Sequence, residues 1–275
     1  MKQLQKSAFI TRMRPVAKAL LSALLQTYEY ASVLVTDSLS KSYRISRSGM
    51  SVSESTSFGD KGVVVKVYDG QSYAEYATSH LTHENIPLVL STIQHRLLTM
   101  ASKLPQGTAP SSYGKLPDEE QTFYAATEYD IHPLELGDEE ILSRLSHAHE
   151  LAMGVDERIV DAVAFSSFQE YHKLFLSEKK DMEQSVLWMA CGLAVMASRG
   201  EEIKDYYKGY SNLGGAEVLS EMENDAKTIA ALAIELLSSE PMVPGIYDCI
   251  CTPEVTGMIV HEAFGHGVEM DMFVK

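Results

Sequence analysis

The chain has 275 residues, of which 45% are hydrophobic, and its formal net charge at pH 7 is −15. This length and composition exclude a disordered chain or a minimal scaffold, because they allow one large core or two moderate ones. The negative charge disfavours nonspecific attraction to nucleic acid or to an anionic membrane, and it favours a cationic peptide. We therefore expect no nucleic-acid partner and no membrane partner. The three cysteines, an odd number without a paired framework, suit a reducing cytosol, so we expect a cytoplasmic protein.

The amino-terminal residues combine basic side chains with a short apolar run, as secretory signals do. The apolar run at 19–25 is short, Gln26 interrupts it, and no small-x-small cleavage site follows. We therefore predict an amphipathic helix at about 15–28 rather than a signal or a membrane span.

Strand signals follow that helix and predict an antiparallel meander. The segments that alternate or run apolar are 31–36, 43–47, 51–57, 63–68 and 72–78. A second helix is predicted at about 85–101, where apolar residues recur at helical spacing. These elements define a predicted amino-terminal α+β domain at 1–104. The segment 105–121 is rich in proline and glycine, which predicts a linker.

A second α+β unit, the central domain, is predicted at 122–239. Its expected elements are a strand at 122–129, a helix at 138–153, a strand at 158–165, a hairpin of 171–177 with 184–198, and a long helix at 216–238. The sequence thus predicts an α+β fold in which antiparallel meanders and hairpins pack with helices in two units. A third region, 240–275, follows them.

That third region carries the most informative motif of the chain, His-Glu-Ala-Phe-Gly-His at 261–266. A short apolar segment at 245–251, bounded by prolines, predicts a strand. The sequence Thr-Pro-Glu at 252–254 is typical of a helix start, with a cap, a proline at the first helical position and an acid in the first turn. The motif is therefore expected near the end of a helix.

The spacing of the two histidines decides what this helix must look like. In the familiar zinc-hydrolase helix they lie four residues apart, and the Glu between them acts as general base. Here they lie five apart, which corresponds to about 140° around an α-helix, too far for one ion held at roughly 2.0 to 2.1 Å. The helix must contain a widened π-type turn or end between the ligands. We assign metal binding to His261 and His266, catalysis to Glu262, and the helix distortion to Gly265, whose missing Cβ tolerates unusual backbone.

The residues from 261 to 269, His-Glu-Ala-Phe-Gly-His-Gly-Val-Glu, closely resemble the zinc motif of the TldD/PmbA family of metallopeptidases. Two weaker similarities lie upstream: 207–215 resembles the family's glycine-rich segment, and 57–65 resembles its amino-terminal hairpin. Met270 departs from the pattern, since the family usually has a small residue there. The resemblance implies a TldD-like subunit with Zn²⁺ as cofactor. It also implies that 240–275 is the start of a mostly β carboxy-terminal metallopeptidase domain.

A catalytic zinc ion needs three protein ligands and a water molecule, and the motif supplies two. The resemblance implies a third ligand, a cysteine beyond Lys275. Because family members are longer, we expect this chain to be truncated, to bind zinc weakly and to be inactive alone. Glu269, Asp271 and Cys249 remain local alternatives for the third ligand. Cys249 and Cys251, two apart on the predicted strand, are expected to be core residues.

Two hypotheses of function follow from the resemblance. The first is a zinc metallopeptidase acting on unstructured or leader-containing peptides, in which the metal activates the attack and Glu262 takes a proton from the attacking water. The second is a noncatalytic partner subunit or interaction module of the same family, including a gyrase-modulator-type role. The resemblance also implies a homodimer, or a heterodimer with a family paralogue. The intact His-Glu-His set favours the enzyme.

Overall fold

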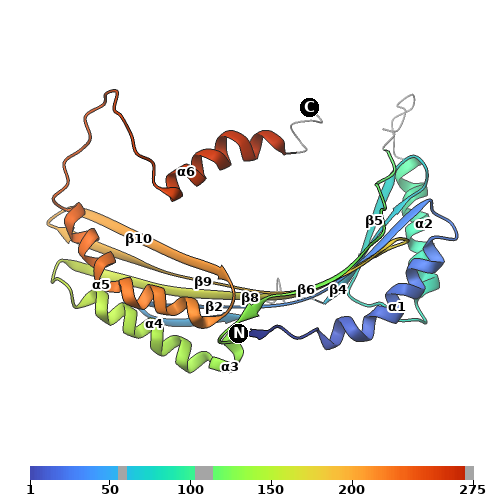
Figure 1. Ribbon diagram of the computed structural model, residues 1–275, viewed down its shortest axis with the longest axis horizontal. Helices are drawn as coiled ribbons and strands as arrows, with labels where there is room; N and C mark the ends of the chain where they lie inside the picture. Colours follow the sequence, from blue (N-terminus) through green and yellow to red (C-terminus); the bar gives the residue numbers. More distant parts are fainter. Residues whose placement is uncertain (55–60, 103–113, 270–275) are drawn as a thin grey trace. The chain divides into compact units, whose positions relative to one another are not determined.

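The computed structural model describes residues 1–54, 61–102 and 114–269 (Figure 1). The chain divides into two compact units, Met1–Ser238 and Ser239–Lys275. The first unit holds all of the β-sheet structure in the described ranges, and the second holds the His-Glu-His motif. The fold of the first unit is mixed α+β.

An eight-stranded sheet forms the centre of the first unit. Its strands are β2 (Tyr30–Ser46), β3 (Gly49–Glu54), β4 (Gly62–Tyr68), β5 (Tyr73–Thr78), β6 (Gln121–Ala126), β8 (Ile159–Ser177), β9 (Lys180–Arg199) and β10 (Glu202–Leu213). Six of them lie in the order β10-β9-β8-β2-β4-β5, while β3 pairs with β2 and β6 pairs with β9. All pairs are antiparallel except that of β6 with β9. A separate short pair joins β1 (Lys2–Gln3) to β7 (Glu128–Tyr129).

Helices cover one face of this sheet (Figure 1). They are α1 (Ala8–Leu24), α2 (Ile86–Ser102), α3 (Pro133–Leu136), α4 (Asp138–Met153), the short η1 (Ala216–Val218) and α5 (Leu219–Leu236). None of the helices in the described ranges is long and apolar enough to cross a membrane.

The sheet carries two hydrophobic cores on that same face. One core joins α4 and α5 to β8 and β9 and includes Leu145, Phe168 and Ile229. The other joins α1 and α2 to β2, β4 and β8 and includes Leu20 and Leu174. Phe168 and Leu174 lie an even number of residues apart on β8, so their side chains leave the same face of the sheet. The two helical layers therefore cover different stretches of one surface.

The sequence predicted two domains, 1–104 and 122–239, but in the structure one sheet contains strands from both segments. β2 pairs with β8 over a continuous register from Ser32 opposite Ser177 to Ile45 opposite Ala164. The two segments consequently form one compact unit with two cores rather than two separate units. Of the predicted linker, 114–120 contains no helix or strand, and 105–113 lies outside the described residues.

The central strands are longer than predicted. β2 joins the predicted strands 31–36 and 43–47 into one, and β8 joins 158–165 and 171–177. The polar residues between these segments hide the strand signal in the sequence, yet they pair with one another in the sheet. The polar residues therefore lie between the two hydrophobic cores, and they do not mark the end of either strand.

Helix α1 begins earlier than predicted. It starts at Ala8, where the Ser7 side chain accepts a hydrogen bond from the backbone N–H of Ile10 at 3.1 Å, so Ser7 is the N-cap. Pro15, predicted as the first helical residue, lies inside the helix. Its cost is offset by burial of the apolar stripe on both sides, including Ile10 and Leu20.

The predicted strand at 245–251 is absent, and this prediction was wrong. The segment has no regular structure, and all of its side chains are exposed, including those of Cys249 and Cys251. A strand needs a neighbour to satisfy its backbone groups, and no described segment pairs with this one. The two cysteines are therefore not core residues in this structure.

Candidate metal centre

The motif lies at the end of helix α6 (Pro253–Val260) in the second unit. Thr252 has extended backbone, Pro253 occupies the first helical turn, and Glu254 supplies the acid there. The backbone N–H of Thr256 donates to the carbonyl oxygen of Thr252 at 2.9 Å, which closes the first turn. The helix start therefore lies where the sequence predicted it.

Directly after α6 the helix widens into a π-helical turn, η2 (His261–Gly265). The backbone N–H of His266 donates to the carbonyl oxygen of His261, five residues earlier, instead of to a group four residues earlier. The two imidazole rings consequently lie beside each other, with centroids 4.7 Å apart and planes at 80°. The widened turn that the five-residue spacing required is present.

This turn gathers three side chains that can ligate a metal. One ligand atom from each of His261, Glu262 and His266 lies within 4.8 Å of the others. Oε2 of Glu262 is 3.7 Å from Nε2 of His266. Two imidazoles and a carboxylate are donor types that zinc accepts, so the residues present fit that ion. The roles assigned to these residues remain predictions.

Gly265 does not contribute in the way that the sequence suggested. Its backbone is ordinary right-handed helix, with φ −55° and ψ −53°. A Cβ built there would come no closer than 4.0 Å to Nδ1 of His261 or to the carbonyl oxygen of Val260. The widened turn therefore needs neither left-handed backbone nor the missing side chain at this position.

The local alternatives for a third ligand are not part of the cluster. Oε1 of Glu269 lies 2.7 Å from Nδ1 of His266, so this carboxylate contacts the imidazole itself. Cys249 lies on the exposed segment before α6, where its Sγ contacts the carbonyl oxygen of Tyr247 at 3.6 Å. Asp271 lies outside the described residues. Among the described side chains the cluster thus contains two imidazoles and the Glu262 carboxylate.

A second set of histidines, which the sequence did not single out, lies in the first unit between the two cores. Oε2 of Glu170 on β8 is 3.0 Å from Nε2 of His132, and its Oε1 is 2.8 Å from Nε2 of His172. Burial alone would raise the pKa of Glu170, but the hydrogen bonds with the two histidines have the larger combined effect and lower this pKa to about 2. The spacing of Glu170 and His172, two residues apart on one strand, is the signal that could have revealed the pair.

The geometry around His172 resembles a proton relay, since its Nδ1 lies 2.8 Å from Oγ of Ser185. Ser185, however, is only 1% exposed, so its hydroxyl cannot meet a substrate. Nδ1 of His132 likewise accepts a hydrogen bond from the backbone N–H of Leu134 at 3.2 Å. Each ring nitrogen of the pair has a protein partner, and we assign this cluster a structural role.

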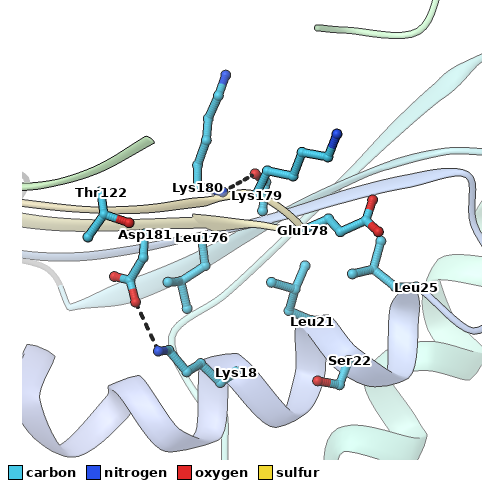
Figure 2. Close-up of a pocket in the computed structure, with 11 residues that line it drawn as sticks. Lys18, Leu21, Ser22, Leu25, Thr122, Leu176, Glu178, Lys179, Lys180 and Asp181 are labelled. Carbon is cyan, nitrogen blue, oxygen red and sulfur yellow. Dashed lines mark hydrogen bonds and ion pairs between the residues drawn. The ribbon is translucent and has the colours of Figure 1, made fainter. Parts of the chain in front are cut away.

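The first unit also has a hollow of about 390 Å³ between α1 and the turn that joins β8 to β9. Figure 2 shows Leu21 of α1, and Leu25 directly after this helix, on one side of the hollow. The ammonium group of Lys18 lies 2.9 Å from a carboxylate oxygen of Asp181. Among the residues that the structure describes, no His or Cys lines this hollow. This hollow therefore offers no soft metal ligand and is not a second candidate for the metal centre.

No protein-family model matches the chain. A curated protein named Metalloprotease from Methanothermobacter thermautotrophicus is 29% identical over 133 residues, which is 48% of this chain and 29% of that protein. Metalloprotease slr0863 from Synechocystis sp. is 27% identical over 158 residues, which is 57% of this chain and 34% of that protein.

Solved structures show the same fold. A candidate modulator of a DNA gyrase from Thermotoga maritima has a TM-score of 0.64 and 17% identity, covering 85% of this chain and 50% of the other. TldE from Thermococcus kodakarensis has a TM-score of 0.57 and 12% identity, covering 81% of this chain and 47% of the other. The match spans about a third of the curated relatives and about half of the solved chains. The chain thus has the α+β fold of these solved proteins. It also has distant relatives that carry the name metalloprotease.

Proposed function

We propose that this chain is part of a zinc metallopeptidase of the TldD/PmbA family. The observation that carries the proposal is the π-helical turn that places the ligand atoms of His261, Glu262 and His266 within 4.8 Å of one another. The metalloprotease relatives and the fold shared with TldE support it. The resemblance of 261–269 to the family's zinc motif supports zinc as the metal.

In this proposal each residue of the turn has one task. His261 and His266 hold the ion through imidazole nitrogens, and a third ligand comes from elsewhere in the complete protein. Zinc in such a site polarises a substrate carbonyl and lowers the pKa of a water molecule. Glu262, whose Oε2 lies 3.7 Å from Nε2 of His266, is close enough to the ion's ligands that it would accept the proton of the attacking water.

The substrates in this proposal are unstructured or leader-containing peptides, cut in the cytoplasm by a homodimer or by a heterodimer with a paralogue. The formal charge of −15 supports cationic peptides, because it raises their local concentration near the protein.

A noncatalytic role as partner subunit or gyrase modulator is the alternative, and the fold shared with TldE and with a candidate gyrase modulator supports it. The His-Glu-His set favours the peptidase, because an interaction module has no need of ligand atoms gathered on one turn.

The deciding experiment uses the product of the complete reading frame. Zinc is measured by mass spectrometry and hydrolysis is measured with an unstructured cationic peptide. Glu262→Gln is expected to keep the zinc while hydrolysis falls by about 10² to 10⁴, the usual contribution of a general base. His266→Ala is expected to lose both, and Asp248→Asn, which changes an exposed carboxylate upstream of α6, is the matched control.

Loss of zinc in Glu262→Gln would make Glu262 a ligand and overturn its role as base. A wild-type protein that binds zinc but cleaves peptides only with a paralogue would favour the partner-subunit alternative.

A further inference from the structure

Glu269 contacts the second histidine of the motif on the side away from Glu262. Oε1 of Glu269 lies 2.7 Å from Nδ1 of His266, whereas Oε2 of Glu262 lies 3.7 Å from Nε2 of the same ring. The two carboxylates therefore take opposite edges of one imidazole. Nε2 is thus the ring nitrogen that lies beside Glu262, a member of the cluster that can hold a metal.

The short contact fixes where the ring carries its proton. An ionised carboxylate only accepts hydrogen bonds, so Nδ1 of His266 must be the donor. In a neutral imidazole the other nitrogen then has a free lone pair. The hydrogen bond to Glu269 consequently leaves Nε2 of His266 ready to ligate an ion.

The backbone explains why Glu269 reaches this position. After the π-helical turn, the chain continues as a 3₁₀ turn, η3 (His266–Val268), and the backbone N–H of Glu269 lies 3.5 Å from the carbonyl oxygen of His266. A 3₁₀ turn has three residues per turn, so side chains three apart eclipse each other. The π turn aligns His261 with His266, and the 3₁₀ turn then aligns Glu269 with His266.

We propose that Glu269 is a positioning residue, which orients His266 and selects its metal-binding tautomer without ligating the ion itself. The proposal rests on the metallopeptidase function proposed above. Carboxylates that accept the second ring N–H of a metal-ligating histidine fix the ring and raise its basicity, and their loss typically weakens metal binding 10- to 100-fold. Because both side chains are about half exposed, we expect the lower end of that range.

The first test needs no metal. Nitrogen-15 NMR of the 275-residue chain, at a pH where the rings are neutral, reports which nitrogen of His266 carries the proton. The wild type is expected to show mainly the Nδ1–H form, and Glu269→Ala is expected to shift His266 towards the Nε2–H form. Glu269→Gln, whose amide oxygen can accept the same hydrogen bond, is expected to keep the wild-type form. An unchanged tautomer in Glu269→Ala would overturn the proposal.

The second test measures zinc affinity by chelator competition in the same three proteins. Glu269→Ala is expected to bind about tenfold more weakly, with most of the loss recovered in Glu269→Gln. Asp248→Ala, which removes another exposed carboxylate of the second unit, controls for the lost charge. Equal weakening in Glu269→Ala and Asp248→Ala would overturn the proposal, because it would reduce Glu269 to a general charge effect.

The two tests separate this proposal from the proposed function. A tautomer shift in Glu269→Ala, together with no zinc binding by the complete protein, would overturn the metallopeptidase and leave the positioning contact standing. If the complete protein binds zinc and Glu269→Ala leaves this binding unchanged, the positioning role of Glu269 is overturned and the metallopeptidase proposal remains.

Discussion

The two units of the chain are stabilised in different ways. The first unit buries two hydrophobic cores against one sheet, with residues such as Leu145 and Leu20 fully buried. In the second unit every described side chain is exposed, and only Gly265 is half-buried. Its geometry is produced by backbone hydrogen bonds of α6, the π-helical turn and the 3₁₀ turn. The candidate metal ligands thus lie in a segment whose backbone geometry is defined but whose described side chains are not packed in a core.

Hydrogen exchange would test this comparison most strongly. The amides of α5 are held by a buried apolar stripe, so they should exchange only through large-scale unfolding. Helix α6 has eight residues and no buried side chain, and a helix of that length is marginal in water. We expect protection factors in α5 to exceed those in α6 by about 10³ or more. Comparable protection in the two helices would contradict the comparison.

A matched pair of glycine substitutions sharpens the comparison. A Cβ on Gly215, which precedes η1, would lie 2.0 Å from the backbone oxygen of Ile131, so the backbone must move. We expect Gly215→Ala to lower the free energy of unfolding of the first unit by about 3 kcal/mol. Gly267 lies in the second unit, and a Cβ there would meet nothing within 4 Å. Gly267→Ala should therefore change the free energy of unfolding by less than about 0.5 kcal/mol. Urea unfolding measures both, and equal effects would show that the first unit is not tightly packed at Gly215.

Acid should act on the first unit through Glu170. Its pKa is about 2 in the folded chain and 4.5 in its ordinary state, so the folded state favours the ionised form. The stabilisation is therefore complete above about pH 4.5 and is lost as the pH falls towards 2. Glu170→Gln should cost about 2 kcal/mol at pH 7 and flatten the decline in this window. Urea titrations at several pH values measure the decline.

The control for the acid experiment is Glu119→Gln, since Glu119 is an exposed side chain. This variant should behave as wild type at every pH. A decline between pH 4.5 and 2 that is as steep in Glu170→Gln as in wild type would assign acid sensitivity to other carboxylates.

The smallest expected effect belongs to Gly265→Ala. Because its backbone is helical and a Cβ has room, we expect zinc affinity to change less than twofold, and alanine's helix propensity to favour the turn by up to about 1 kcal/mol. Chelator competition and circular dichroism measure the two quantities. A tenfold loss of affinity would restore the need for glycine that the sequence suggested.

Sequence patterns predicted the elements whose signals are local. The helix predicted at 138–153 has those bounds in the structure, and the long helix predicted at 216–238 contains α5. The widened turn followed from counting residues between two histidines, because helix geometry allows few ways to bring them together.

Several of the other differences between the predicted and the observed structure have a common physical cause, which is dependence on distant partners. The segment 245–251 has strand-like residues but no neighbouring strand, and β2 continues through polar residues because β8 lies beside them. The Glu170 cluster needs His132, which is 38 residues away along the chain. A short pattern can reveal Glu170 and His172 on one strand, but only the fold brings His132 to them.

The pairing of β2 with β8 also sets the order in which the protein can be completed during synthesis. Val35 pairs with Leu174, so more than a hundred residues must be made before that edge of β2 has its neighbour. At the usual elongation rates of about 5 to 20 residues per second, the wait lasts roughly 7 to 28 seconds. During that time one long edge of β2 is unpaired and open to other strands. For the nascent chain the most vulnerable period is therefore the translation of 69–174, when all residues of β4 have been made but the β8 partner of Val35 has not.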